Sequence, residues 1–240
     1  MKNNLVGFIL LIGITFLFSC KEEVPIIIPI ETSSVTDASG NIYKTVKIGA
    51  QWWMAENLQT SKYRNGNSIE LLANSEAWET GSAGYCIYDN SILAPGFLYN
   101  WEAVKNENGL APQGWHVATE EDWKNLERFL KMPETEINKI SWRNEGLVGD
   151  KLKTKGPNNW LRYENVWGNN ESGFDAVSGG CRLNNGEWGL PGLGATGFWW
   201  TDTEFDYNNG WMRQLDSKKS GVFRYYISKK YGLSVRCVKD

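Results

Sequence analysis

The densest run of side chains able to bind a ligand lies at residues 199–211. Asp202, Glu204 and Asp206 alternate along it, and Asn208 adds an amide carbonyl. Carboxylate and amide oxygens are the hard ligands that Ca²⁺ prefers in proteins. The run does not match an EF-hand loop, because its glycine comes too late and no closing glutamate follows. Two interpretations remain: a calcium site, or a polar hairpin whose acids face solvent while tryptophans pack beneath.

Amide and aromatic side chains accompany these acids over the second half of the chain. An indole follows shortly after a pair of asparagines, and further rings flank the acidic run. Amides hydrogen-bond to sugar hydroxyls, and an indole face stacks on a sugar ring or anchors a protein partner. Most of the 13 tryptophans are expected in the core. The predicted ligand-binding residues are Asn184, Asn185, Trp188, Asp202, Glu204, Tyr207, Asn208 and Trp211.

Groups for catalysis are scarce. His116 is the single histidine, so it would have to serve any Ser/His/Asp triad, and no Gly-x-Ser-x-Gly elbow accompanies it. A histidine-rich iron site lacks its ligands for the same reason. The segment around His116 has the pattern of a buried strand, so we expect a hydrogen-bonded core residue there. The 28 acids offer carboxylate pairs for glycosidase-like hydrolysis, but the sequence singles out none, and no catalytic residue is predicted.

The N-terminus has the features of a lipoprotein signal. Lys2 precedes an apolar stretch at residues 5–18, which is shorter than the roughly 20 residues needed to span a bilayer. The stretch ends in Leu-Phe-Ser-Cys, which resembles the lipobox of bacterial lipoproteins, and the thiol of Cys20 is the nucleophile that takes the lipid. We therefore predict a signal peptide at 1–19 and a lipidated tether at 20–34, which two prolines keep extended.

The residues after Cys20 predict where the lipoprotein goes. They read Lys21-Glu22-Glu23, which resembles a signal that one Gram-negative phylum uses to send lipoproteins to the outer cell surface. We expect an outer-membrane lipid anchor with display at the cell surface; a periplasm-facing anchor is the alternative. The membrane is the expected partner through that anchor. The formal charge is only −3 and no Lys/Arg-rich run occurs, so nucleic acid is not an expected partner.

The rest of the chain, residues 35–240, shows no internal linker and is predicted to be one domain. Residues 37–41 read as a turn, and 42–48 alternate apolar and polar side chains as a half-buried strand does. Two helices are expected. One is short, at 99–105, and the other runs over 119–131, with Thr119 as N-cap, acids in its first turn and a proline that stops it.

Six segments in order resemble one family, the Fibrobacter succinogenes major paralogous domain, which is common in secreted and surface lipoproteins. The matching segments are Asp37 to Leu58, Gly96 to Trp101, Gly114 to Thr119 with Asp122 and Trp123, Gly179 to Arg182, Phe198 to Glu204, and Tyr231 to Asp240. The resemblance implies an α+β, C-type-lectin-like fold with small antiparallel sheets, two short helices and long ordered loops. It also implies a relation to formylglycine-generating enzymes and a ligand face between residues 184 and 226.

The resemblance bears on the cysteines as well. If the Gly-Gly strand and the last strand are neighbours, Cys181 and Cys237 come close, and a disulfide is the expected outcome for a protein outside the cytoplasm. The family often carries a cysteine where this chain has Ala111, so the usual partner of Cys237 is missing. Cys86 is then left single or paired otherwise, and the pairing stays open.

These observations lead to one hypothesis about function and two alternatives. The hypothesis is a non-enzymatic, surface-displayed lipoprotein that recognises glycan or protein ligands through its loop face. This function requires no cofactor, although bound calcium is possible. One alternative is an enzyme, either a degenerate oxidase of the formylglycine type or a carboxylate-based hydrolase. The other is a structural envelope lipoprotein that binds nothing specifically, which burial of nearly every tryptophan would favour.

Overall fold

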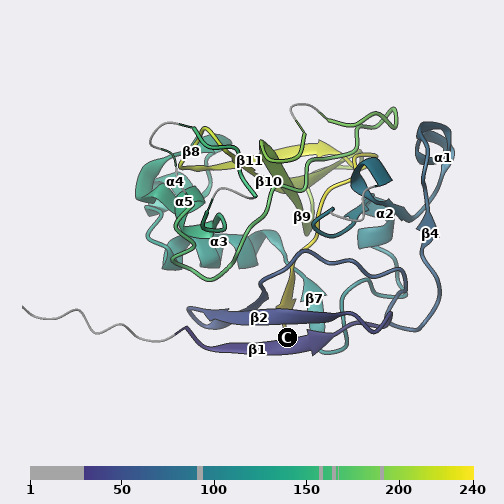
Figure 1. Ribbon diagram of the computed structural model, residues 1–240, viewed down its shortest axis with the longest axis horizontal. Coiled ribbons are helices and arrows are strands. Elements are labelled where there is room, and N and C mark those ends of the chain that lie inside the picture. Colours follow the sequence, from purple (N-terminus) through teal and green to yellow (C-terminus); the bar gives the residue numbers. More distant parts are fainter. Residues whose placement is uncertain (1–29, 91–93, 157–158, 164–165, 167, 190–191) are drawn as a thin grey trace, which may run out of the picture.

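The computed structural model describes residues 30–90, 94–156, 159–163, 166, 168–189 and 192–240 (Figure 1). The predicted signal peptide, the lipidation site Cys20 and most of the predicted tether therefore lie outside the described residues. Within the described part, every helix is too short or too polar to span a bilayer.

A five-stranded antiparallel sheet contains both ends of the domain. Its strands are β1 (Thr32–Thr36), β2 (Ile42–Ile48), β3 (Gln51–Met54), β7 (Trp115–Val117) and β12 (Cys237–Lys239), in the order β1-β2-β3-β12-β7. The predicted strand at 42–48 is confirmed, and Gly49, at φ 63°, makes the tight turn into β3. The pairing of β1 with β2 takes in residues 32–34, which the sequence assigned to the tether.

A second, four-stranded antiparallel sheet carries the longest strands. It consists of β8 (Ser141–Arg143), β9 (Thr196–Glu204), β10 (Asn209–Asp216) and β11 (Val222–Ser228), in the order β8-β11-β10-β9. A third, small sheet joins β4 (Glu70–Leu71), β5 (Gly84–Cys86) and β6 (Leu98–Tyr99), and its β4–β5 pair is parallel. Figure 1 shows the five-stranded and four-stranded sheets on opposite sides of the domain, with α3 between them on one side.

Both predicted helices are present, as α2 (Trp101–Val104) and α3 (Glu120–Phe129). Thr119 caps α3 in a capping box with Asp122, as its sequence predicts. The helix ends two residues before the expected Lys131, because Lys131 takes a left-handed conformation, φ 74°. Three further short helices were not predicted, since four to six residues show no periodicity: α1 (Ser75–Thr80), α4 (Glu134–Ile137) and α5 (Val148–Leu152). Two single 3₁₀ turns complete the described set, Tyr88–Asn90 and Glu145–Leu147.

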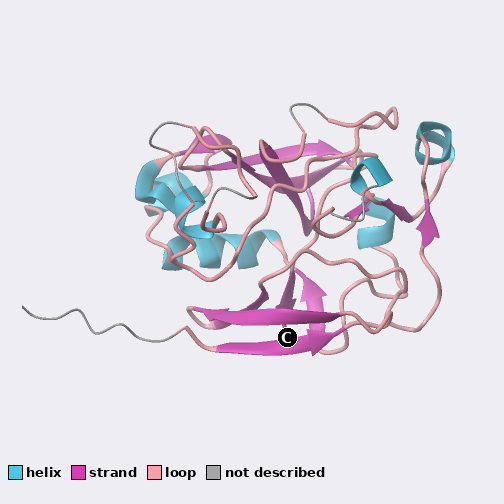
Figure 2. Cartoon of the chain, in the orientation of Figure 1, coloured by secondary structure: helices cyan, strands magenta, loops and turns pink. Residues whose placement is uncertain are grey.

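The predicted α+β class is confirmed: short helices and small, mostly antiparallel sheets are joined by long loops (Figure 2). Aromatic side chains fill its interior. Eight of the twelve tryptophans that the structure describes are buried, with Trp53, Trp123, Trp199 and Trp200 among the largest fully buried side chains. Trp52, Trp142, Trp188 and Trp211 are half-buried instead. These four retain ring surface that the core does not use.

Candidate functional site

The predicted acidic run forms the end of the β9–β10 hairpin. Phe205 donates its N–H to the carbonyl of Asn209 and closes the turn, at 3.0 Å. Asp206 Oδ1 accepts the backbone N–H groups of Asn208 and Asn209, both at 2.8 Å. A hydrogen bond from the Asn209 side chain contributes most to holding the pKa of Asp206 below its ordinary value. Asp206 therefore builds the turn, and Tyr207 at its tip is 87% exposed.

The other two acids of the run are engaged by lysines. Asp202 pairs with Lys105, which follows α2, and Glu204 pairs with Lys229 at 3.1 Å. Lys229 also donates to the carbonyl of Tyr207, at 2.8 Å. Throughout the described chain, no three His, Cys, Asp or Glu side chains gather in a way that would hold a metal ion. In this geometry, lysines and backbone N–H groups hold the three acids of the hairpin.

Next to this hairpin, aromatic rings follow one another across the surface of the four-stranded sheet. Trp142 and Phe223 have ring centroids 5.2 Å apart, and Phe223 and Tyr225 are 5.6 Å apart. Tyr225 stacks on Tyr226 at 4.6 Å. The series continues with Tyr226 on Phe205 at 3.7 Å and ends with Phe205 edge-on to Trp211 at 5.0 Å. We call these residues the aromatic row: Trp142, Phe223, Tyr225, Tyr226, Phe205 and Trp211.

The contact between Tyr225 and Tyr226 has a cause in the sheet. Consecutive strand residues point to opposite faces, so their rings would ordinarily be separated by the backbone. β8 pairs with residues 222–224 of β11, and beyond Arg224 no strand among the described residues pairs with that side of β11. Two side chains from opposite faces can meet around such an open edge. The row is therefore continuous from one face of the sheet to the other, and both Phe205 and Tyr225 keep more than a third of their surface exposed.

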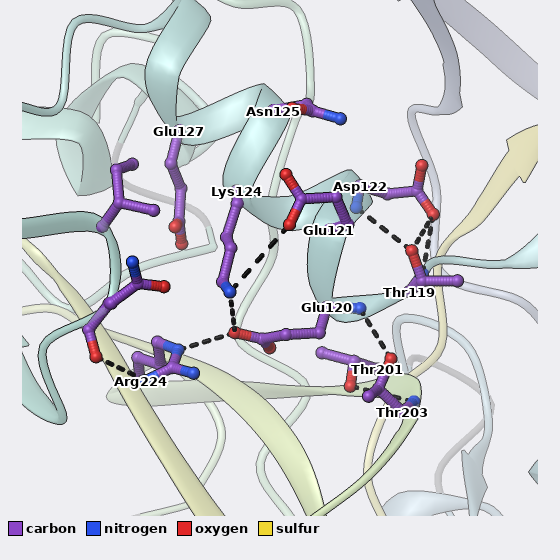
Figure 3. A network of polar contacts seen from close by, with 12 residues as sticks. Thr119, Glu120, Glu121, Asp122, Lys124, Asn125, Glu127, Thr201, Thr203 and Arg224 are labelled. Atoms are coloured by element: carbon purple, nitrogen blue, oxygen red, sulfur yellow. Dashed lines mark hydrogen bonds and ion pairs between the residues drawn. The ribbon is translucent and has the colours of Figure 1, made fainter. Parts of the chain in front are cut away.

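An arginine fixes the last ring of the row. The Arg224 guanidinium lies 3.8 Å from the centroid of the Trp211 ring. Arg224 itself is buried and donates from Nε to Glu120, at 2.6 Å. Figure 3 shows Glu120 reaching from the first turn of α3 to Arg224, while Thr203 of β9 accepts the Glu120 backbone N–H at 3.0 Å. Burial acts to raise the pKa of Glu120, but the arginines Arg213 and Arg224 outweigh it, and the pKa lies below its ordinary value.

This contact belongs to a larger buried ion network between α3 and the sheet. Glu127 accepts from Arg143 at 2.8 and 2.6 Å and from Arg213 at 2.7 Å, and Arg213 also binds Glu120. The side chains of Arg143, Arg213 and Glu127 are fully buried. Such charges are tolerated inside a protein only when they are paired and hydrogen-bonded. The network therefore anchors the sheet that carries the aromatic row to α3.

The remaining predicted ligand residues lie elsewhere. Asn184, Asn185 and Trp188 belong to a tight turn that docks on α1, where Ser75 Oγ donates to the carbonyl of Gly186 at 2.8 Å. Asn184 is exposed, and Asn185 bonds Glu187 within the turn. Among the described residues, no hydrogen bond, ion pair or ring contact joins this turn to the β9–β10 hairpin. The structure thus divides the predicted site into two groups.

Trp188 is the stacking residue of the second group. Its ring lies 4.6 Å from that of Tyr88 and 4.0 Å from the guanidinium of Arg182, centroid to Cζ. The ring is half-buried. Trp188 is thus a surface aromatic, as predicted, but its partners come from residues that the sequence did not connect to it.

His116 lies on a strand, β7, as predicted, but it is half-exposed rather than buried. β7 is an edge strand of the five-stranded sheet, and about 35% of the His116 side chain is exposed. Nδ1 lies 2.7 Å from Asp240 and Nε2 lies 3.0 Å from Asp122. The hydrogen bond to Asp122 contributes most to raising the pKa of His116 to about 9. The imidazolium between two carboxylates ties the last strand to the start of α3.

The cysteines differ from the expectation of a disulfide. Cys86, Cys181 and Cys237 are all free and buried. Cys181 and Cys237 belong to the same core cluster without a bond between their sulfurs. Burial raises the pKa of Cys86 to about 12 and that of Cys181 to about 11, so both are neutral thiols at neutral pH. An oxidase of the formylglycine type would need exposed thiols, and the thiols of these three cysteines are buried.

The structure also singles out a carboxylate pair that the sequence could not. Glu56 and Asp175 line a cavity of about 260 Å³ between the loop after β3 and two distant loops. Glu56 Oε2 accepts the backbone N–H of Lys44 at 2.6 Å, and Asp175 Oδ1 accepts the side chain of Asn170 at 3.0 Å. The two acids are far apart in the chain, and a single sequence contains no sign that they share a cavity.

Most of the aromatic row was likewise missed. The predicted face, 184–226, contains Phe205, Phe223, Tyr225 and Tyr226, but the sequence does not distinguish them from core aromatics. The one available signal is the consecutive Tyr225-Tyr226 pair, since alternation in a half-buried strand allows only one of two neighbours to enter the core.

One family model matches the chain, that of the Fibrobacter succinogenes major domain, over residues 46–239. The comparison with curated proteins and the comparison with solved structures found no match.

Proposed function

We propose that this chain, which belongs to the Fibrobacter succinogenes major domain family, is a non-enzymatic recognition lipoprotein whose aromatic row binds glycans. One observation carries the proposal: six rings, each in contact with the next, run from one face of the four-stranded sheet to the other, and Phe205 and Tyr225 among them are each more than a third exposed. Large exposed apolar surfaces on soluble domains mark binding sites.

The chemistry of the row favours a glycan over a protein. Sugar rings carry C–H groups on their faces and hydroxyls on their edges, so they combine stacking with hydrogen bonding at the rim. The hairpin supplies such a rim: Tyr207 at its tip is almost fully exposed, and Glu204 and Asn208 in the same hairpin are exposed as well. The rings are already held in place by Arg224 and by one another, so little conformational entropy is lost on binding.

The location is part of the same proposal. The apolar segment at 5–18, the Leu-Phe-Ser-Cys sequence and Lys21-Glu22-Glu23 support lipidation at Cys20 and display on the outer membrane. A tether of some ten residues between Cys20 and β1 would let the domain face away from the lipid surface.

The proposal is tested by a glycan array and by calorimetry on the full-length lipoprotein in detergent, with and without calcium. We expect a specific hit that Trp211→Ala and Tyr225→Ala each weaken at least tenfold, which corresponds to about 1.4 kcal/mol. Trp52→Ala is the matched control, since Trp52 is also half-buried but lies on β3. Binding of a protein but no glycan, or equal loss in the Trp52 variant, would contradict the proposal.

A second candidate function has its own observation. The cavity between Glu56 and Asp175 offers the two carboxylates that glycoside hydrolysis requires, one as acid and one as base or nucleophile. If the chain is a carboxylate-based hydrolase, it releases reducing ends from bound glycans, and Glu56→Gln and Asp175→Asn each abolish the release. If glycans bind the aromatic row and no reducing ends are released from them, recognition is the function and the hydrolase is excluded.

A further inference from the structure

Five arginines are buried in the described structure, and four of them have clear partners. Arg143, Arg213 and Arg224 share the carboxylates of Glu120 and Glu127. Arg236 donates four hydrogen bonds, to the side chain of Asn57 and to three backbone carbonyls. The fifth is Arg182, of which 2% is exposed.

Arg182 lacks such a partner. Its Nε is buried without a hydrogen bond, and no carboxylate within the described chain forms an ion pair with it. Cys86 is a titratable group near it, and that thiol is neutral because burial raises its pKa to about 12. Among the described residues, the buried Arg182 side chain therefore has no carboxylate partner, and its Nε has no hydrogen bond.

Two indoles accompany the guanidinium instead. The Trp188 ring centroid lies 4.0 Å from Cζ and that of Trp78 lies 5.9 Å away. Cation–π contacts of this kind stabilise a desolvated cation. They offset only part of the cost of burying a charge that has no ion-pair partner. Proteins retain such uncompensated groups mainly where a ligand completes them.

We propose that Arg182 binds the carboxylate of an acidic sugar whose ring stacks on Trp188. The inference rests on the proposed glycan-binding function and names the class of sugar for a second contact point. The guanidinium presents a planar fork of N–H donors that matches a carboxylate in two parallel hydrogen bonds. The Trp188 ring lies beside that fork, with 4.0 Å between its centroid and Cζ, and Asn184 is exposed on the adjoining turn for a sugar hydroxyl.

Entry of the carboxylate requires a movement of Trp188. The guanidinium is covered, and Trp188 is the half-buried ring stacked on it, in a turn that Gly186 and Gly189 flank. The ring must turn aside from its contact with Tyr88 when the ligand binds. Binding therefore changes the environment of one indole, which provides a spectroscopic signal independent of affinity.

The test uses the full-length lipoprotein and three probes: trigalacturonate, its methyl ester, which keeps the shape but removes the charges, and galactotriose. We expect trigalacturonate to bind at least tenfold more tightly than either neutral probe, with a change in tryptophan fluorescence that Trp188→Phe removes. Arg182→Gln and Arg182→Lys should each abolish the preference, because one loses the charge and the other the fork. Arg128→Gln, on the exposed face of α3, should leave it intact.

Each result decides between the proposals. If the methyl ester binds as tightly as the acid, or if Arg182→Lys retains the preference, the assignment of Arg182 is overturned. Because the methyl ester reports without any substitution, a variant that fails to fold does not weaken the test. If galactotriose binds in a manner sensitive to Trp211→Ala while no acid preference exists, the glycan proposal stands without this one. If none of the three probes binds and the array is blank, both fail.

Discussion

Replacement of Glu127 by glutamine is the sharpest test of how the sheet is held on α3. Glu127 accepts three charge-assisted hydrogen bonds, two from Arg143 and one from Arg213, at 2.6–2.8 Å. Glutamine has nearly the same volume, so no cavity forms. The substitution removes one negative charge, however. The NH₂ group of glutamine would also face a guanidinium, and two hydrogen-bond donors cannot bond to each other. Arg143 would then lose its carboxylate, and Arg213 and Arg224 would share the single remaining one, that of Glu120.

The expected loss of stability follows from that geometry. Removing one partner of a buried ion pair costs about 3–5 kcal/mol, because an uncompensated charge stays in the interior. For a domain of this size each kcal/mol lowers the Tm by about 2–4 °C, so Glu127→Gln should lower it by about 6–20 °C. Glu121→Gln is the matched control on the same helix. Glu121 is 61% exposed and pairs with Arg128 at 2.7 Å, and an exposed pair contributes less than about 1 kcal/mol.

Urea and thermal unfolding followed by tryptophan fluorescence measure both variants. A loss below about 1 kcal/mol for Glu127→Gln, or equal losses for the two variants, would refute the reasoning that this network anchors the sheet. Retention of native near-UV circular dichroism at low temperature shows that the variant still folds. Measured on that folded variant, glycan binding should persist, because Glu127 does not touch the aromatic row.

Three further perturbations have definite outcomes. Hydrogen bonds to Asp122 and, less, to Asp240 raise the pKa of His116 from 6.5 to about 9, so the charged ring should stabilise the fold fully below pH 6.5. That contribution should disappear as the pH rises to 9. His116→Gln should therefore flatten the dependence of the unfolding free energy on pH between 6.5 and 9. Cys86 and Cys181 should resist alkylation in the native protein at pH 8 and react on unfolding, because burial raises their pKa; rapid native labelling would contradict their placement. Gly210→Ala should cost about 1–3 kcal/mol, since a Cβ there would lie 2.4 Å from the Trp101 ring; unchanged urea unfolding would show that the ring gives way freely.

Local features of the sequence were sufficient where neighbours in the chain decide the structure. The alternation at 42–48 predicts β2 because a half-buried strand has a period of two, and Thr119 with Asp122 predicts the start of α3 because the capping box is complete within four residues. The end of α3 was less well predicted, since the left-handed Lys131 depends on packing and not on a breaking residue. Family membership, shown over 46–239, was also readable from ordered motifs.

The site depended on contacts between distant segments. Tyr226 meets Phe205 because β11 pairs with β10, and Tyr225 reaches Tyr226 where β8 stops short of them. The expected pairing of Cys181 with Cys237 fails although both lie in one core cluster, since proximity in a fold does not set the geometry of a disulfide.

By itself, then, the sequence determined the family, the α+β class and the start of α3, because these depend on local patterns and on motifs in order. Only the tertiary structure decided which side chains share a surface. It separated Trp188 from Trp211 and placed Glu56 and Asp175 around one cavity. Within the part of the chain that the structure describes, it also left Arg182 as a buried cation without a carboxylate partner. Burial and charge pairing depend on distances between side chains in space, and the order of residues in the sequence does not give those distances.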